Sequence, residues 1–117
     1  MDGREVFRRA VRITVDSARA VLGKAGLSSG DVALFIPHQA NLRIIEASAW
    51  RLGIPMEHTA IVLDRTGNTS AASIPLAMAE AADRGRIASG DVVLLSGFGA
   101  GMSWASAVLR WAGARTP

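Results

Sequence analysis

Apolar and polar residues recur with helical spacing over residues 4 to about 23. On a helical wheel the arginines gather within one arc and the apolar side chains fill the opposite arc. The arginines are Arg4, Arg8, Arg12 and Arg19, and the apolar residues are Val6, Phe7, Ala10, Val11, Ala18 and Val21. This pattern predicts an amphipathic helix that ends at Gly23 and Gly26.

Shorter periodic runs fill the rest of the chain. They predict a strand at residues 33–37, a helix at about 40–52 that stops at Gly53, a strand at 59–63, a helix at about 70–84, and a hairpin with strands at 91–98 and 102–111. In the 40–52 helix we expect Leu42, Ile45, Ala49 and Leu52 to face inward, and Arg43, Ala47, Trp50 and Arg51 to share the other face. The order α-β-α-β-α-β-β predicts an α/β protein with a mixed sheet.

The helix at 70–84 is unusual because it has no polar stripe at its start. No residue between Thr66 and Ala79 is charged, and apolar side chains point in every direction. A helix that is apolar all round is buried all round, and strand 92–95 is likewise apolar on both faces. A chain of 117 residues is too short to wrap this helix completely. We therefore expect another layer from elsewhere, either a missing half or a partner subunit.

Composition narrows the function classes. Half of the residues are apolar, which predicts one folded unit, and the formal net charge is only +3 with 5% aromatic residues. A nucleic-acid-binding domain usually has a denser basic cluster with interleaved aromatics, so we do not expect that function. Cysteine is absent, which excludes disulfides, zinc–thiolate sites and a cysteine nucleophile within this chain.

Two segments of the sequence indicate whether the protein is secreted or inserted in a membrane. Residues 1–5 run into charged side chains rather than an apolar core, so no secretory signal is expected. Residues 92–109 carry no charge, which is long enough for a membrane span, but Gly97, Gly99 and Gly101 interrupt them. Two strands around a glycine turn fit this run better than a membrane helix. We therefore expect a cytoplasmic protein without a membrane partner.

Three segments contain residues that could take part in binding or catalysis. His38 follows a strand and precedes a helix, where a side chain can enter a cleft at the strand's carboxyl end, although a capping or core histidine fits equally. Asn68 lies in a loop entering a helix, where an ordinary N-cap is the alternative. Residues 97–101 are Gly-Phe-Gly-Ala-Gly, which a tight hairpin explains better than a phosphate loop because a strand follows.

Together these segments resemble a known family. They are Pro-His-Gln-Ala-Asn-Leu-Arg-Ile-Ile at 37–45, Leu-Asp-Arg-Thr-Gly-Asn-Thr-Ser-Ala-Ala-Ser at 63–73, and the glycine-rich run at 97–101. They resemble the C-terminal half of the β-ketoacyl-acyl-carrier-protein synthase III family, which starts fatty-acid chains and whose relatives prime polyketides. The resemblance runs from Gly3 to Trp111 and implies a thiolase-like half-domain, lacking the N-terminal half, as one incomplete unit over residues 1–117.

The resemblance also implies roles for residues. Enzymes of this family use a Cys–His–Asn triad, without a metal or other cofactor, to condense an acyl-CoA starter with malonyl-acyl carrier protein. His38 and Asn68 would donate hydrogen bonds to the enolate formed by decarboxylation. Backbone N–H groups of Gly99, Ala100 and Gly101 would flank the acyl oxyanion. Phe98 would line the acyl pocket.

The arginines gain a candidate partner from the same resemblance. Acyl carrier proteins are acidic, so Arg8, Arg12, Arg43 and Arg51 are candidates to dock one, with a solvated helix face as the alternative. The family's nucleophilic cysteine lies in a half that this chain lacks, so we expect the chain alone to be inactive. The resemblance also implies that the complete enzyme is a homodimer. Two hypotheses follow: the His/Asn half of a working synthase, or a non-catalytic dimerisation and carrier-docking module.

Overall fold

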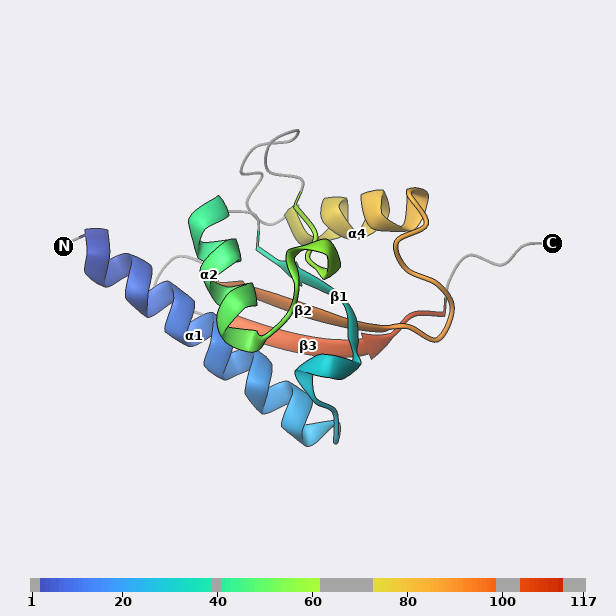
Figure 1. Cartoon of the computed structure of the whole chain (residues 1–117), viewed down its shortest axis with the longest axis horizontal. Coiled ribbons are helices and arrows are strands. Elements are labelled where there is room, and N and C mark those ends of the chain that lie inside the picture. Colours follow the sequence, from blue (N-terminus) through green and yellow to red (C-terminus); the bar gives the residue numbers. More distant parts are fainter. Residues whose placement is uncertain (1–2, 39–40, 62–72, 99–103, 113–117) are drawn as a thin grey trace.

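The computed structural model describes residues 3–38, 41–61, 73–98 and 104–112. Its longest element is α1 (Gly3–Lys24), which crosses one face of the sheet (Figure 1). The buried residues of α1 are Ala10, Val11, Thr14, Val15, Ala18 and Leu22. The amphipathic helix expected from the arginine pattern is therefore confirmed. Val6 is 40% exposed, contrary to expectation, because the first turns of α1 extend away from the sheet (Figure 1).

The described sheet is mixed, as predicted, and has three strands in the order β1 (Val32–Pro37), β2 (Val92–Phe98) and β3 (Trp104–Arg110). β1 pairs with β2 in parallel, and β2 pairs with β3 antiparallel, so the predicted C-terminal hairpin is present. The register between β1 and β2 shifts between Val32 and Leu34, which sends these two side chains into different clusters. Such a bulge redirects side chains without breaking the strand.

The sheet is covered on both faces. On one face α1 and α2 (Leu42–Leu52) pack on a cluster that includes Phe35 and Leu94. On the other face α4 (Ser73–Asp83) packs on a cluster that includes Ile36 and Val93. Successive β2 residues thus alternate between the two clusters, and the prediction that this strand is apolar on both faces is confirmed. Two short 3-10 helices, η1 (Ser29–Asp31) and η2 (Met56–His58), connect the elements.

Local signals set the ends of α2. The side chain of Asn41 accepts hydrogen bonds from the backbone N–H groups of Arg43 and Ile44, which is an N-cap. Gly53 ends the helix in the left-handed conformation at φ 76°. Ile45, Ala49 and Leu52 are buried, as expected, but Leu42 is 43% exposed because it occupies the first position of α2, beyond the contacts with the core.

The predicted strand at 59–63 is wrong as far as the structure describes it. Thr59 makes a single parallel bridge to Phe35, within which the backbone N–H of Ala60 donates to the carbonyl oxygen of Phe35 at 2.8 Å, and no strand is formed at Ala60 and Ile61. The outward groups of Thr59 are satisfied without another strand. Its N–H donates to the carbonyl of Met56, and its carbonyl accepts from the guanidinium of Arg86 at 3.1 Å. Residues 62 and 63 lie outside the described part.

The described side chains of α4, from Ala77 onward, are covered on the face toward the sheet. Ala77 and Ala81 are buried against the sheet, whereas Ala79 is exposed. None of the described elements of this chain lies over the outer face of α4, which agrees with the expectation that 117 residues are too few to wrap this helix. That another layer covers this face stays a prediction. In the described residues, no helix combines the length and the apolar character that crossing a membrane requires.

Candidate functional site

His38 lies directly after the last residue of β1 and is half-buried. Its backbone N–H donates to the carbonyl oxygen of Ser96 on β2 at 2.8 Å, which continues the parallel ladder by one residue. Burial removes water from the imidazole and lowers the pKa of His38 below its ordinary value of 6.5. Near neutral pH the ring is therefore uncharged and holds one N–H donor and one acceptor nitrogen.

The carboxyl ends of β1 and β2 lie at the same end of the sheet because the two strands are parallel. The first turns of α2 and α4 lie at this end too (Figure 1). Backbone N–H groups at helix starts are positive, so the surroundings of His38 favour negative charge. This is the place where ligands bind in open α/β sheets.

Most of the other residues with a predicted chemical role lie outside the residues that the structure describes. Asn68, Gly99, Ala100 and Gly101 all lie outside the described residues. Phe98 ends β2 and pairs with Trp104 through the backbone, which places it one strand away from His38. Among the described residues, β2 ends at Phe98 and α4 begins at Ser73.

Three hydroxyl groups tie β2 to its neighbours close to His38. Ser17 on α1 donates to the hydroxyl of Ser106 on β3 at 2.7 Å, and Ser106 lies 2.9 Å from the hydroxyl of Ser96 on β2. Ser96 is only 3% exposed. This chain of hydroxyls joins three elements and holds the residue whose carbonyl anchors His38. The sequence does not reveal this chain of hydroxyls, because the three serines belong to separate elements that meet only in the folded structure.

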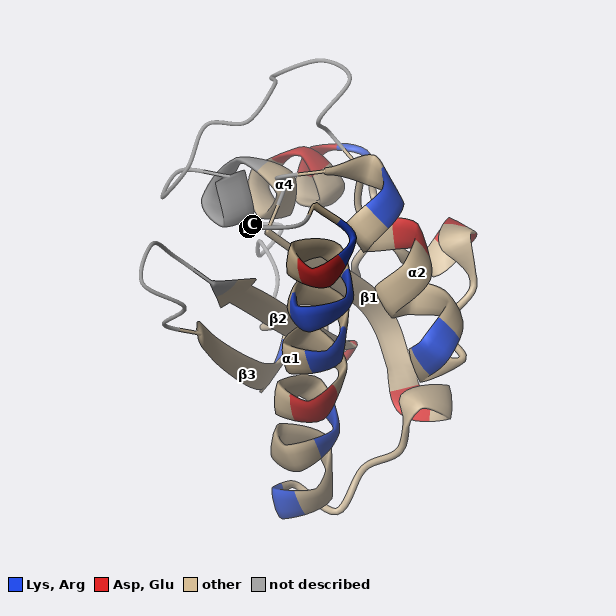
Figure 2. Cartoon of the chain, turned by 90° about the vertical axis from the view of Figure 1, so that its left-hand side faces the viewer, with Lys and Arg blue, Asp and Glu red and all other residues tan. Residues whose placement is uncertain are grey.

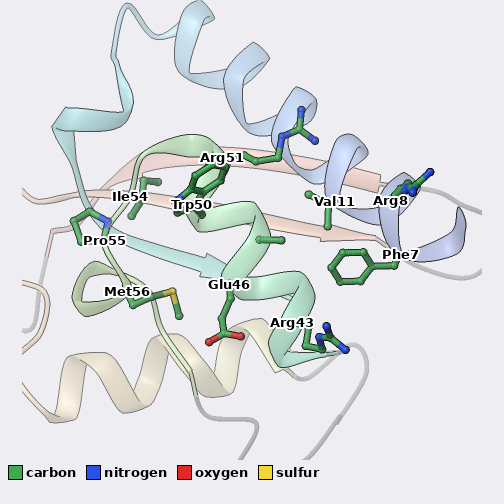
Figure 3. A pocket seen from close by; sticks show the side chains of 11 residues that line it. Phe7, Arg8, Val11, Arg43, Glu46, Trp50, Arg51, Ile54, Pro55 and Met56 are labelled. Carbon is green, nitrogen blue, oxygen red and sulfur yellow. The ribbon is translucent and has the colours of Figure 1, made fainter. Parts of the chain in front are cut away.

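Arg8, Arg43 and Arg51, three of the four arginines predicted to dock a carrier protein, line one groove. The groove has a volume of about 760 Å³ and follows the exposed face of α2, with α1 on one side and η2 on the other (Figure 3). Its other lining residues are Phe7, Val11, Glu46, Ala47, Trp50, Ile54, Pro55 and Met56. We call it the α1–α2 groove. Basic residues lie on successive turns of α1 and also on α2 (Figure 2).

The remaining arginines of α1 have separate positions. Arg12 lies outside the α1–α2 groove and lines a hollow of about 390 Å³ with Arg4, Glu5, Arg8 and Arg9. Arg19 donates from Nη2 to the carbonyl oxygen of Arg51 at 2.9 Å, so it binds the C-terminal end of α2 rather than facing solvent alone. A cation at a helix C-terminus is stabilising, which gives Arg19 a structural role.

The helical spacing places Trp50 on the outer face of α2, where it could form contact surface or pack against a neighbouring element. The structure decides against packing, because Trp50 is 83% exposed. Met56 and Phe7 also line the groove but were not singled out. Helical periodicity could place Trp50 on the outer face of α2, yet the exposure of that face depends on how α1 and η2 flank it. His58 is exposed in η2.

The arrangement defines a class of site: a neutral histidine at the carboxyl end of a parallel strand, beside two helix starts, in a mixed α/β unit. Among the described residues, no cluster of histidine, aspartate and glutamate has the composition of a metal site.

Comparisons with known proteins identify the family. Residues 22–111 match the family model for the 3-oxoacyl-[acyl-carrier-protein (ACP)] synthase III C terminal. The chain is 58% identical over 111 residues to β-ketoacyl-[acyl-carrier-protein] synthase III from Roseiflexus castenholzii, covering 95% of this chain and 34% of that protein. It is 56% identical over 115 residues to synthase III 1 from Deinococcus radiodurans, covering 98% and 34%.

Solved structures agree. The β-ketoacyl-[acyl carrier protein] synthase III from Thermus thermophilus superposes with a TM-score of 0.91 at 59% identity, over 97% of this chain and 36% of that one. The priming β-ketosynthase of the R1128 polyketide pathway superposes with a TM-score of 0.88 at 46% identity, over 97% and 34%.

The chain belongs to the family of 3-oxoacyl-ACP synthase III C-terminal domains. It spans about a third of the length of the relatives it matches.

Proposed function

We propose that this chain supplies the histidine and asparagine of a 3-oxoacyl-ACP synthase III, which condenses an acyl-CoA starter with malonyl-ACP. The observation that carries the proposal is the placement of His38, half-buried, uncharged near neutral pH and anchored to Ser96 at the carboxyl end of the sheet. The chain forms one incomplete unit, and a Cys-bearing segment completes its site. The complete enzyme is a homodimer that acts in the cytoplasm.

The chemistry requires a neutral donor. When the malonyl thioester loses carbon dioxide, the electron pair of the broken C–C bond moves onto the thioester as an enolate. His38 and Asn68 donate hydrogen bonds to the enolate oxygen and stabilise the developing charge. The enolate carbon then attacks the acyl thioester on the cysteine, and the thiolate leaves. N–H groups of Gly99, Ala100 and Gly101 stabilise the oxyanion of that attack.

We propose that the substrate reaches His38 between α1 and α2. A hollow of about 420 Å³, lined by residues that include Phe7, Asn41 and Ile44, lies between the starts of α1 and α2. Asn41 is three residues from His38, and the hollow shares Phe7 and Arg43 with the α1–α2 groove. We propose that a thioester arm enters here while its carrier protein docks at Arg8, Arg43 and Arg51, with Arg12 extending the basic surface along α1. Phe98 lines the acyl pocket.

The test combines this chain with a Cys-bearing N-terminal segment of a close relative and measures decarboxylation of malonyl-ACP. We expect His38→Ala to slow decarboxylation about 10²–10³-fold, as removal of one oxyanion donor does. His58→Ala is the matched control, since His58 is exposed in η2 and away from the sheet end. Decarboxylation at an unchanged rate in His38→Ala would support the non-catalytic docking module instead.

A second measurement tests the dependence on a partner segment. The chain has no cysteine, so we expect no radiolabelled acyl group to become attached when it is incubated alone with acyl-CoA. Covalent labelling of the chain by itself would contradict the proposal.

A further inference from the structure

Position 96 interrupts the apolar pattern of β2. Val92 and Leu94 belong to the cluster under α1 and α2, and Ser96 is the next residue of the strand on that face. Ser96 is only 3% exposed, and a buried hydroxyl costs free energy unless it forms a hydrogen bond. An aliphatic side chain would fill the same place without that cost, so the serine favours a directional role.

The hydroxyl of Ser96 is linked through β3 to α1. Ser96 lies opposite Ser106 in the antiparallel ladder, and their hydroxyl oxygens are 2.9 Å apart. Ser17 donates from α1 to the hydroxyl of Ser106 at 2.7 Å. The ladder bonds lie within the sheet, whereas α1 crosses one face of it (Figure 1). The hydroxyl chain therefore fixes this end of the sheet to the helix on that face.

The same serine of β2 holds the backbone of His38. Ser96 lies opposite Pro37 in the parallel ladder, and its carbonyl oxygen accepts the N–H of His38 at 2.8 Å. This bond lies at the carboxyl end of the ladder, and strand ends open more readily than strand centres. A shift of Ser96 is passed directly to His38, and displacing a reacting group by about 1 Å can cost about a hundredfold in rate.

We propose that Ser17, Ser106 and Ser96 are positioning residues for His38. They fix the end of β2 against α1 and so hold the main chain of His38 where its ring donates to the enolate oxygen. The proposal rests on the proposed function and deepens it, because the three serines act through His38 and not on the substrate.

Hydrogen exchange of single backbone amides, measured by NMR on the whole chain, tests the proposal without any activity. Ser106→Val removes the central hydroxyl, and Ser106→Thr keeps it in a side chain of the same shape. We expect the His38 amide to exchange about tenfold faster in Ser106→Val and at an unchanged rate in Ser106→Thr. The Ala60 amide is the reference, because it donates to the carbonyl oxygen of Phe35 at 2.8 Å on the other edge of β1. A global loss of stability speeds both amides alike.

A second variant keeps the test independent of packing around Ser106. Ser17→Ala adds no atoms and places a good helix former in α1, so the chain should fold. It removes the hydroxyl that ties Ser106 to the helix, and it should raise the exchange of His38 relative to Ala60 in the same direction. Circular dichroism checks that each variant is folded, and Ser17→Ala decides alone if Ser106→Val does not fold.

Decarboxylation of malonyl-ACP by the chain combined with a Cys-bearing segment tests the catalytic part. Ser106→Val should lower kcat about tenfold with KM unchanged, because the proposed docking residues are intact. Added to His38→Ala, the same substitution should cause no further loss, since it acts through His38. Equal losses with and without the His38 ring would overturn the proposal.

The exchange rate of His38 relative to Ala60 separates the remaining outcomes. An unchanged ratio in Ser106→Val or in Ser17→Ala overturns the proposal, as does an equal rise in Ser106→Val and Ser106→Thr. If His38→Ala leaves decarboxylation unchanged, the proposed function fails, while the ratio still decides whether the serines hold the backbone of His38.

Discussion

The backbone N–H of His38 and the carbonyl oxygen of Ser96 lie 2.8 Å apart and form the last rung of the ladder between β1 and β2. Residues beyond a strand end are usually free to vary in conformation. Here the main chain of His38 is fixed to the central strand. The catalytic proposal therefore places the imidazole on an anchored backbone, and the first prediction concerns that ring.

We predict that His38 makes stability depend on pH. Because its pKa is lowered in the folded chain, the folded state binds fewer protons than the unfolded state at and just below pH 6.5. The free energy of unfolding should thus fall as the pH drops through this range. Urea unfolding at about pH 7.5 and about pH 5.5 measures the change.

A variant provides the comparison for this prediction. His38→Gln should reduce the pH dependence between these conditions. An NMR titration of the His38 ring that gave a midpoint at or above 6.5 would contradict the assignment.

We predict that Ser106→Ala destabilises the fold by about 1–3 kcal/mol. The substitution removes the hydroxyl that lies between Ser17 and Ser96, and it leaves the buried Ser96 hydroxyl without this partner. Chemical denaturation measures the loss.

Ser48→Ala should behave in the opposite way and serves as the contrast. The Ser48 hydroxyl is fully buried and has no hydrogen-bond partner among the described residues. Its removal should be neutral or should stabilise the chain by up to about 1 kcal/mol, because alanine also favours the helix. Equal destabilisation by both serine variants would mean that the hydroxyl chain contributes nothing specific.

Two glycines give opposite predictions for the same substitution. Gly53→Ala should cost about 1–2 kcal/mol, because alanine is strained at φ 76° even though a Cβ there meets no atom within 4 Å. Gly23→Ala should stabilise by about 0.5–1 kcal/mol, because Gly23 is helical, exposed and equally free of contacts. Thermal unfolding of the pair checks both signs, and a loss of stability in Gly23→Ala would show that the end of α1 needs its glycine.

Local signals made much of the fold predictable. Gly53 gives the end of α2, the arginine spacing gives the exposed face of α1, and the uncharged run with its glycines gives the hairpin. Each of these depends on neighbours in the sequence. The position of His38 was predictable for the same reason, since a strand stops at the proline just before it.

Features that depend on tertiary contacts were not predictable. Leu42 has the same helical spacing as Ile45 but extends beyond the core, and the described residues 59–61 form one bridge to β1 where the sequence predicts a strand. The serine hydroxyls of α1, β2 and β3 meet only because the strands pair. The apolar surface at Trp50 likewise requires α1 and η2 on either side of α2.

The pairing of β1 with β2 also has a consequence for synthesis of the chain. Val32 pairs with Val92, sixty residues later in the sequence. A ribosome adds about 5–20 residues per second, so β1 leaves it several seconds before its partner exists. During that interval Phe35 and Ile36, both fully buried in the finished fold, lack the strand that covers them. Strand β1, which ends just before His38, is therefore synthesised before β2 and can be covered only after β2 has followed. In the interval chaperones can bind it while translation continues.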